Sequence, residues 1–186
     1  MTDAEALAAW LLTRQPGRPV EACGATAIFT AICGQAITAD IQFRGPRAPT
    51  AREQLLLQAP GVPAVHERRG TLQAAPGMPV AEITAVLLPS RLPRAAGELL
   101  GITGSGDAPP AGAGVPLGRA LRGLGVRREP LQARLTPGAS DASGQEQVIH
   151  SASLLWLGGP VALVTERVYR SFLAAFPGPW PASPRR

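Results

Sequence analysis

The chain has 186 residues, of which 45% are hydrophobic and 17% are charged, a balance typical of one globular domain with its own core. Its 21 glycines and 20 prolines are too many for a mostly helical protein, so we expect strands and turns. All 18 basic residues are arginine, which excludes Schiff-base and P-loop chemistry, because both need a lysine. The net charge of +5 comes from scattered arginines, and the chain has few aromatic residues on which bases could stack. We therefore expect no nucleic-acid partner.

The cysteines and the first residues exclude further classes of protein. Cys23 and Cys33 lie in no C-x-x-C motif or Cys/His cluster, so we expect two buried thiols and no metal site. The start of the chain carries acidic residues where a secretory signal is basic, and no apolar run is long enough to span a membrane. We therefore expect a cytoplasmic chain that forms a single domain over residues 1–186, with a frayed proline-rich tail at 177–186.

The first predicted elements are a helix and a hairpin. Thr2 and Glu5 form a capping-box pattern, and apolar residues then recur at helical spacing, which predicts a helix over 3–13. Between 25 and 43 the period changes to two and a Gly-Gln pair supplies a turn, so we predict a hairpin there. The apolar residues of its second strand are expected on one face and are Ile37, Ala39, Ile41 and Phe43.

The middle of the chain predicts a covering segment, a second hairpin and a helix. Residues 45–63 hold four prolines around a short helical stretch at 51–58, so they fit a flap over the sheet better than a strand. The strand candidates 65–73 and 80–88 are joined by the turn signal APGMP. A helix capped by serine is predicted over 90–100.

The last third of the chain predicts a linker, a short helix and a third hairpin. Residues 101–114 form a Gly/Ala/Pro linker that lacks the strand and helix flanking a phosphate-binding loop. A short helix starts at Pro116, because helices accept proline in their first turn. A strand over 127–135 precedes a polar loop and an apolar hairpin of strands 148–157 and 161–169. Three hairpins and few helices predict an α+β fold with a single antiparallel sheet.

Conventional catalytic motifs are absent from the sequence. His66 and His150 are the two histidines, and with no G-x-S-x-G or HExxH motif beside them we interpret both as surface or strand residues. Glu166 differs, because in a strand it shares its face with Val164 and Val168. If the strand faces inward, burial raises the pKa of Glu166 and suits it to donate a proton or a hydrogen bond. An edge strand in which Glu166 pairs with an arginine is equally favoured by this pattern.

A second candidate is the start of the Pro116 helix. Proline donates no backbone N–H, whereas Leu117 and Gly118 have theirs free in the first turn. A ligand carboxylate fits that position, and an arginine from a facing element would complete the site with a bidentate ion pair. Every helix start offers free N–H groups, so this feature carries weight only together with others.

Six short motifs, in one order along the chain, resemble the chorismate pyruvate-lyase family. That family has an early Trp-Leu-Leu helix, an arginine-bearing strand, a G-x-P turn, a strand ending in proline, a Pro-Leu-Gly motif, and an S-x-L-x-L-x-G hairpin reaching Thr-Glu. The corresponding segments are Trp10-Leu11-Leu12, Arg68-Arg69, Gly77-Met78-Pro79, Leu87-Leu88-Pro89, Pro116-Leu117-Gly118, and 153–159 continuing to Thr165-Glu166. The resemblance spans nearly the whole chain, and its specificity comes from the order and spacing of the motifs.

The resemblance implies a fold and a chemistry. The implied fold is a six-stranded antiparallel sheet with helices packed on one side and an internal ligand site. By resemblance, Arg69 binds a substrate carboxylate, with Arg68 one residue away as the alternative. Leu117, with Gly118 beside it, offers backbone N–H to the same carboxylate, and Glu166 is the catalytic residue near the oxygen at the far end of the ring. The implied reaction is a carbon–oxygen lyase step that releases pyruvate from chorismate, leaves 4-hydroxybenzoate, and needs no metal or organic cofactor.

One departure from the family pattern bears on the substrate. The family carries a second arginine on the second strand of the middle hairpin, where this chain has Thr84 or Ala85. Losing one buried arginine–carboxylate contact costs on the order of 2–5 kcal/mol of binding free energy. Either Arg44, Arg68 or Arg91 replaces the missing arginine, or the substrate differs.

Three hypotheses for the function follow. The first is a lyase acting on chorismate or a related aromatic-precursor acid. The second is a non-catalytic module that binds a small carboxylate, similar to the effector domains of bacterial transcription regulators. The third is a pseudoenzyme or interaction protein that keeps the sheet alone. In the first two, the expected partner is a small aromatic or cyclohexadiene carboxylate.

Overall fold

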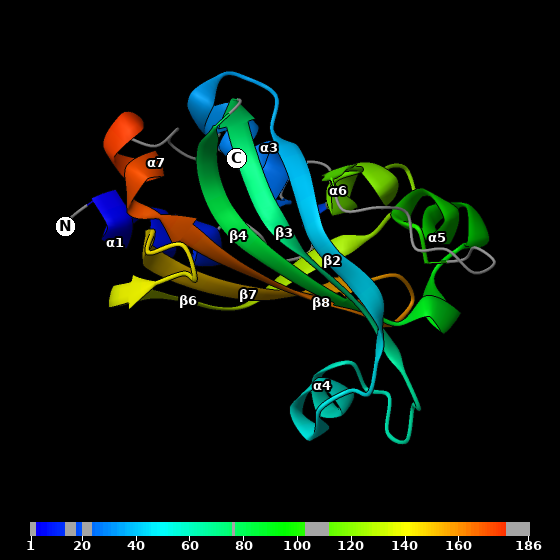
Figure 1. Cartoon of the computed structure of the whole chain (residues 1–186). Helices are drawn as coiled ribbons and strands as arrows, with labels where there is room; N and C mark the ends of the chain where they lie inside the picture. The colour runs from blue at the N-terminus through cyan, green and yellow to red at the C-terminus, as the bar shows by residue number, and fades with distance from the viewer. Residues whose placement is uncertain (1–2, 14–17, 20–23, 76, 103–111, 178–186) are drawn as a thin grey trace.

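The computed structural model of the chain describes residues 3–13, 18–19, 24–75, 77–102 and 112–177 (Figure 1). These residues form strands and a set of short helices. The strands are β1 (Arg18–Pro19), β2 (Thr38–Arg47), β3 (Val65–Ala75), β4 (Met78–Leu87), β5 (Gly112–Gly114), β6 (Arg127–Ser140), β7 (Glu146–Trp156) and β8 (Pro160–Tyr169). The helices are α1 (Asp3–Thr13), α3 (Ala25–Cys33), α4 (Ala51–Leu56), the 3-10 helix η1 (Pro89–Arg91), α5 (Arg94–Leu100), α6 (Leu117–Ala120) and α7 (Arg170–Ala175).

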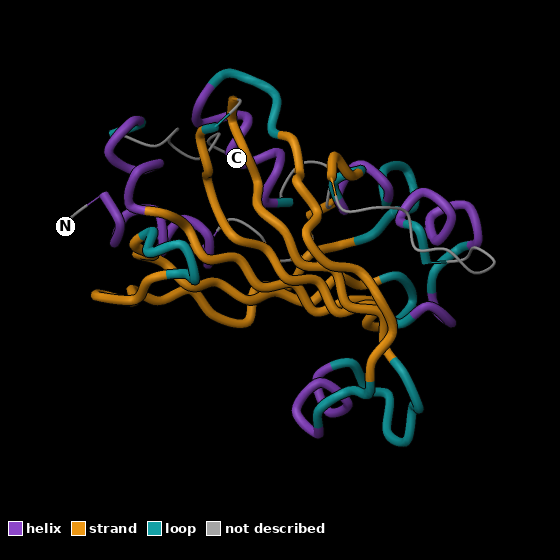
Figure 2. The backbone as a smooth tube through the Cα atoms, viewed as in Figure 1, coloured by secondary structure: helices purple, strands orange, loops and turns teal. Residues whose placement is uncertain are grey.

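The described strands join one antiparallel sheet in the order β1-β6-β7-β8-β4-β3-β2-β5 (Figure 2). The predicted fold class, α+β with a single antiparallel sheet, is therefore confirmed. The hairpins β3–β4 and β7–β8 lie where alternating apolar residues and Gly/Pro turns predicted them. The sheet has eight strands instead of six, because β1 and β5, two and three residues long, extend its edges. Segments this short carry no alternation that a sequence pattern can show.

Helices cover the two faces of the sheet unequally. On one face, called here the covered face, Ile41, Leu72, Ile149 and Val168 pack with residues of α1, α3 and α7. Figure 1 shows α3 and α7 on the upper side of the sheet and α4 below it. Helices α5 and α6 extend this layer over the other end of β4 and β8. The opposite, open face carries α4 and the loop that follows it, where Leu57 is fully buried. The predicted packing of helices on one side thus holds for α1, α3, α5, α6 and α7 but not for α4.

Residues 25–33 form α3, so the predicted hairpin over 25–43 is wrong in its first half. Ile28 and Phe29 are buried on the covered face, and the ring of Phe29 meets that of Phe172 edge-on with centroids 5.2 Å apart. The prediction failed because isoleucine, threonine and phenylalanine favour strands. Gly34, whose φ of 70° ends the helix in the left-handed region, was instead interpreted as part of a hairpin turn.

A bulge in β2 overturns the predicted face of Phe43. The pairing with β3 skips Gln42, and Phe43 then pairs with Arg69, so the alternation of side chains restarts after Ile41. Phe43 points to the open face, where 40% of it is exposed, instead of sharing the face of Ile41. Arg44, the next residue, therefore points to the covered face.

Three local predictions also differ from the structure. The helix expected from Ser90 begins at Arg94, because Pro93 precedes it and residues 89–91 form η1. Strand β6 continues to Ser140 through part of the stretch predicted as a polar loop, with an irregular pairing after residue 135. Helix α7 was not predicted.

Other predictions concern the two cysteines, the linker and the tail, and parts of these lie outside the described residues. Cys33 is half-buried rather than buried, and its thiol donates to the carbonyl oxygen of Phe29 at 2.9 Å. Cys23, most of the predicted linker (103–111) and the tail from 178 to 186 lie outside the described residues. Among the described helices, none combines the length and the apolar character needed to cross a membrane.

Candidate functional site

Glu166 lies on the covered face of β8, in the interior of the sheet, and only 2% of it is exposed. Its Oε2 accepts hydrogen bonds from the guanidinium of Arg128, at 3.0 Å, and from the hydroxyl of Ser151. Nε of Arg128 donates to the hydroxyl of Ser153 at 2.9 Å. The two interpretations of Glu166 are therefore combined in the structure: the strand faces inward, and the carboxylate pairs with an arginine.

A small cavity lies beside Glu166, between the sheet and the start of α6. Its volume is about 40 Å³, and its wall includes Leu117, Gly118, Arg128 and Glu166. The structure thus brings three of the predicted site residues together. Binding sites for drug-sized ligands measure roughly 300–1,000 Å³. This cavity therefore has room for one small group of a ligand and not for a whole ring acid.

Arg68, and not Arg69, lies on the same face of the sheet as Glu166. Arg68 is 3% exposed, and its Nη2 donates to the backbone carbonyl of Val115 at 3.0 Å. Arg69 points to the open face, where its Nε lies 2.7 Å from a carboxylate oxygen of Glu67 and its side chain is 53% exposed. The geometry therefore favours Arg68 over Arg69 as the arginine that meets an anion on the covered face.

Two further basic residues gather around Arg68, and we call Arg44, His66 and Arg68 the cationic cluster. Arg44 pairs with Arg68 across the strands, and His66 lies two residues before Arg68 on the same face of β3. Nε of each arginine and Nε2 of His66 are buried without a hydrogen-bond partner. Neither arginine forms an ion pair within the described part of the chain. Sequence patterns alone gave His66 no role, because a lone histidine in a polar strand has no partner motif.

Burial and neighbouring positive charges lower the pKa values of Arg68 and His66. Burial lowers the pKa of Arg68 to about 10, and the charge of Arg44 adds to this effect. The pKa of His66 is also lowered, first by burial and then by the charges of Arg68 and Arg44. Both shifts disfavour the charged forms, so the empty cluster is electrostatically unfavourable.

Ala85 fills the place of the missing second arginine on the covered face, where it pairs with Arg68, whereas Thr84 points to the open face. Of the possible replacements, Arg91 is engaged elsewhere, because its guanidinium donates to three backbone carbonyl oxygens at 2.7 to 2.9 Å. Arg44 is the replacement that lies beside Arg68. The sequence offered Arg44 as a possible replacement but did not show on which face of the sheet it lies, because a bulge such as that in β2 has no clear sequence signature.

A groove of about 690 Å³ borders the small cavity and lies between α3, the start of β2, β5 and α6. Thr26, Pro116 and Gly118 line both spaces, which are therefore neighbours. Val115 also lines the groove, and its carbonyl oxygen accepts the hydrogen bond from Arg68. The volume suits a small organic acid, and Arg68 of the cationic cluster reaches the groove wall at Val115.

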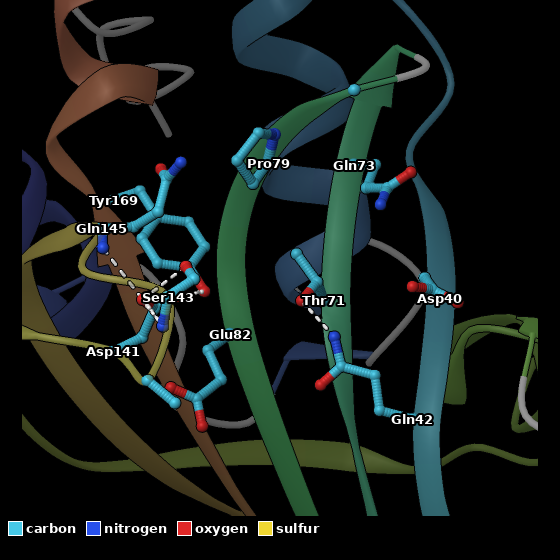
Figure 3. Close-up of a pocket in the computed structure, with 12 residues that line it drawn as sticks. Asp40, Gln42, Thr71, Gln73, Pro79, Glu82, Asp141, Ser143, Gln145 and Tyr169 are labelled. Carbon is cyan, nitrogen blue, oxygen red and sulfur yellow. Dashed lines mark hydrogen bonds between the residues drawn. The ribbon is translucent and has the colours of Figure 1, made fainter.

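A separate cleft of about 390 Å³ lies on the open face, near the β3–β4 turn (Figure 3). Figure 3 shows Asp40 and Glu82 on strands of its floor, with Asp141 and Tyr169 at one side. The Tyr169 hydroxyl donates to Asp141 at 2.8 Å, and burial followed by this hydrogen bond raises the pKa of Tyr169. Burial alone would raise the pKa of Asp141, but hydrogen bonds from Ser143 and Tyr169 outweigh it and lower that pKa. The described residues include no His, Cys, Asp and Glu group suited to hold a metal ion.

Comparison with known proteins places the fold. No family model matches the sequence, and no curated protein matches it. The effector domain of PhnF from Mycobacterium smegmatis superposes with a TM-score of 0.51 and 13% identity, over 74% of this chain and 83% of that domain. The longer PhnF structure from the same organism gives a TM-score of 0.51 and 13% identity, over 76% of this chain and 61% of that one.

A possible transcriptional regulator, YydK from Bacillus subtilis, matches with a TM-score of 0.48 and 14% identity, over 72% of this chain and 57% of the regulator. The chain thus spans about three fifths of the length of YydK and of the longer PhnF structure. At these identities the likeness to PhnF shows the fold alone. This chain therefore has the same fold as the effector domain of PhnF.

Proposed function

We propose that this chain is a non-catalytic module that binds a small organic anion, in the manner expected of an effector domain with this fold. The observation that carries the proposal is Arg68, a guanidinium that is 3% exposed and has no carboxylate partner in the described part of the chain. Arginines are almost never fully buried unless they are paired. A ligand carboxylate would supply the missing partner by a bidentate contact.

The surroundings of Arg68 support this proposal. Its neighbour Val115 lines a groove large enough for a small acid, and the groove continues to the cavity of Leu117 and Gly118. An anion held by Arg68 would therefore have room for its carbon skeleton. Arg119 and Arg122, which line the groove as well, add positive charge near its mouth and favour the approach of anionic ligands.

The geometry of the site supports the lyase hypothesis less well than it supports anion binding. A proton-handling Glu166 needs a carboxylate that reaches the substrate; Arg128 and Ser151 hold its Oε2, and its Oε1 is buried beside the small cavity without a hydrogen-bond partner. The cavity beside it has a volume of only about 40 Å³. Ala85 stands where the family has its second arginine. Each of these features is compatible with the binding of an anion, and none of them is evidence for turnover.

Titration calorimetry with benzoate, 4-hydroxybenzoate and chorismate tests the proposal, together with an assay for pyruvate release from chorismate. We expect at least one acid to bind the wild-type chain and no pyruvate to form. Arg68→Gln should weaken binding by about 30-fold or more, since a buried charged contact contributes about 2 kcal/mol or more. The matched control is Arg94→Gln, because Arg94 is 89% exposed and pairs with Glu98 on the surface.

Two results would contradict the proposal. If the wild type and Arg68→Gln bound the acid with equal affinity, Arg68 would not be part of the binding site. Steady release of pyruvate that Glu166→Gln abolishes would restore the lyase hypothesis.

A further inference from the structure

The cationic cluster carries two permanent positive charges on directly opposed residues. Arg44 and Arg68 are cross-strand partners on the covered face, and their Cβ atoms lie about 5 Å apart at such positions. Like charges directly opposite each other destabilise a sheet. Arg68 is buried and Arg44 is partly buried, and no described carboxylate pairs with either one, so a ligand with a single negative charge would leave one of the two guanidinium groups without an anionic partner.

His66 adds a third donor to the same place. It is 7% exposed, its Nε2 has no hydrogen-bond partner, and it lies one strand step of about 7 Å from Arg68. Arg68 on its own strand and Arg44 on β2 are the charged groups that act on it. Its partner on β4 is Leu87, which packs in the apolar layer under α5 and α6 and brings no charge.

We propose that Arg44, Arg68 and His66 together bind one doubly charged oxyanion, the phosphomonoester-type head group of the ligand. This inference rests on the proposed anion-binding function and specifies the group that the site accepts. A phosphomonoester carries about 1.5 to 2 negative charges at pH 7 and offers three strong acceptor oxygens. Two guanidinium groups and one imidazole match that number of oxygens, and two guanidinium charges balance the dianion.

The same geometry separates this head group from other anions. A monocarboxylate brings one charge and two oxygens, so it satisfies one arginine. A phosphodiester of a nucleic-acid backbone also brings one charge. Arg68 and His66 are only 3% and 7% exposed, so a polymer backbone lying on the surface would not contact them.

His66 gives the site a dependence on pH. An anion bound beside His66 favours its protonated form and therefore raises the pKa that burial and the arginines lower in the empty site. Binding then takes up a proton, so affinity for a dianion rises as the pH falls. Sulfate isolates this effect, because its own charge stays at −2 over the range of interest.

Calorimetric titration of the whole chain with sodium sulfate and sodium acetate, at matched ionic strength, tests the inference. We expect sulfate to bind at least about tenfold more tightly than acetate at pH 6, since it compensates one further buried charge. Arg44→Gln should abolish this preference and keep acetate binding, whereas Arg44→Lys should keep part of it. His66→Gln should remove the gain in sulfate affinity between pH 8 and pH 5.5, and Arg94→Gln should change nothing.

The possible failures are distinguishable. Equal affinities for sulfate and acetate in the wild type, or an unchanged preference in Arg44→Gln, would overturn the dianion site and leave the anion-binding function intact. No binding of either anion, or full binding by Arg68→Gln, would overturn both. Circular dichroism of each variant separates loss of binding from loss of the fold.

Discussion

Replacing Arg68 by methionine should stabilise the unliganded protein, although it removes the residue on which binding depends. The pKa of Arg68 is about 10 in the folded chain, whereas an unperturbed arginine has a pKa of about 12.5. Each tenfold change in proton affinity corresponds to about 1.4 kcal/mol, so keeping Arg68 charged and buried costs roughly 3 kcal/mol of folding free energy. Because the folded pKa is the lower one, this cost is fully present below pH 10 and is lost as the pH rises above it.

One favourable contact offsets part of that gain. The guanidinium donates to the carbonyl oxygen of Val115 at 3.0 Å, and a hydrogen bond from a charged donor contributes about 1.5 to 3 kcal/mol. Methionine fills a similar volume with a flexible apolar chain. The net expectation for Arg68→Met is therefore an increase of about 1 kcal/mol in the free energy of unfolding at pH 7.5.

Urea unfolding followed by circular dichroism measures this change as a higher midpoint with an unchanged slope. Arg91→Met is the matched control, because that guanidinium donates to three carbonyl oxygens and its removal should destabilise the chain by about 1–3 kcal/mol. Opposite signs for the two variants are the expected result. If Arg68→Met destabilises the chain as much as Arg91→Met does, the idea of an uncompensated charge is refuted.

Three further changes test the packing around the site. Glu166→Gln should lower the free energy of unfolding by about 1.5–3 kcal/mol in urea titrations, because it removes the buried carboxylate that accepts hydrogen bonds from Arg128 and Ser151; an unchanged midpoint would contradict this expectation. Gly70→Ala should destabilise the chain by more than about 2 kcal/mol, since the added Cβ would lie 2.2 Å from a carbonyl oxygen of β2. Gly45→Ala is the control and should be nearly neutral, because no atom lies nearer than 3.5 Å to its Cβ. The lowered pKa of His66 predicts that the free energy of unfolding falls as the pH drops below about 6.5, because the unfolded chain takes up the proton first. Thermal melts from pH 8 to 5 should show a smaller decrease in melting temperature for His66→Asn than for the wild type. An identical decrease would contradict the lowered pKa.

The sheet could be predicted from the sequence where one face of a strand is clearly apolar. The β7–β8 hairpin shows this, because apolar alternation and a Gly-Gly-Pro turn mark both strands. Helix α3 could not be assigned in the same way, since its nine residues are rich in isoleucine and threonine and favour a strand locally. It becomes a helix because Ile28 and Phe29 pack against the sheet and against Phe172.

The candidate site was predictable in its residues more than in its geometry. Strand β3 reads His66-Glu67-Arg68-Arg69, so both of its faces are polar and a period of two cannot show which arginine turns inward. Pairing of Arg68 with Ala85 and its hydrogen bond to the carbonyl oxygen of Val115 decide that question, and both are long-range contacts. The ion pair of Glu166 with Arg128 joins β8 to β6 across β7, which no local pattern reveals.

The bulge at Gln42 means that the charge of the covered face depends on the pairing register of β2 as well as on its residues. In a regular pairing without the bulge, Gln42 would pair with Arg69, Phe43 with Arg68 and Arg44 with Glu67, which would turn Phe43 inward and carry Arg44 to the open face. The covered face would then lose a cation beside Arg68 although the sequence stays the same. A single backbone irregularity therefore sets the electrostatics of this part of the sheet, and a substitution that removes the bulge would alter them without replacing a charged residue.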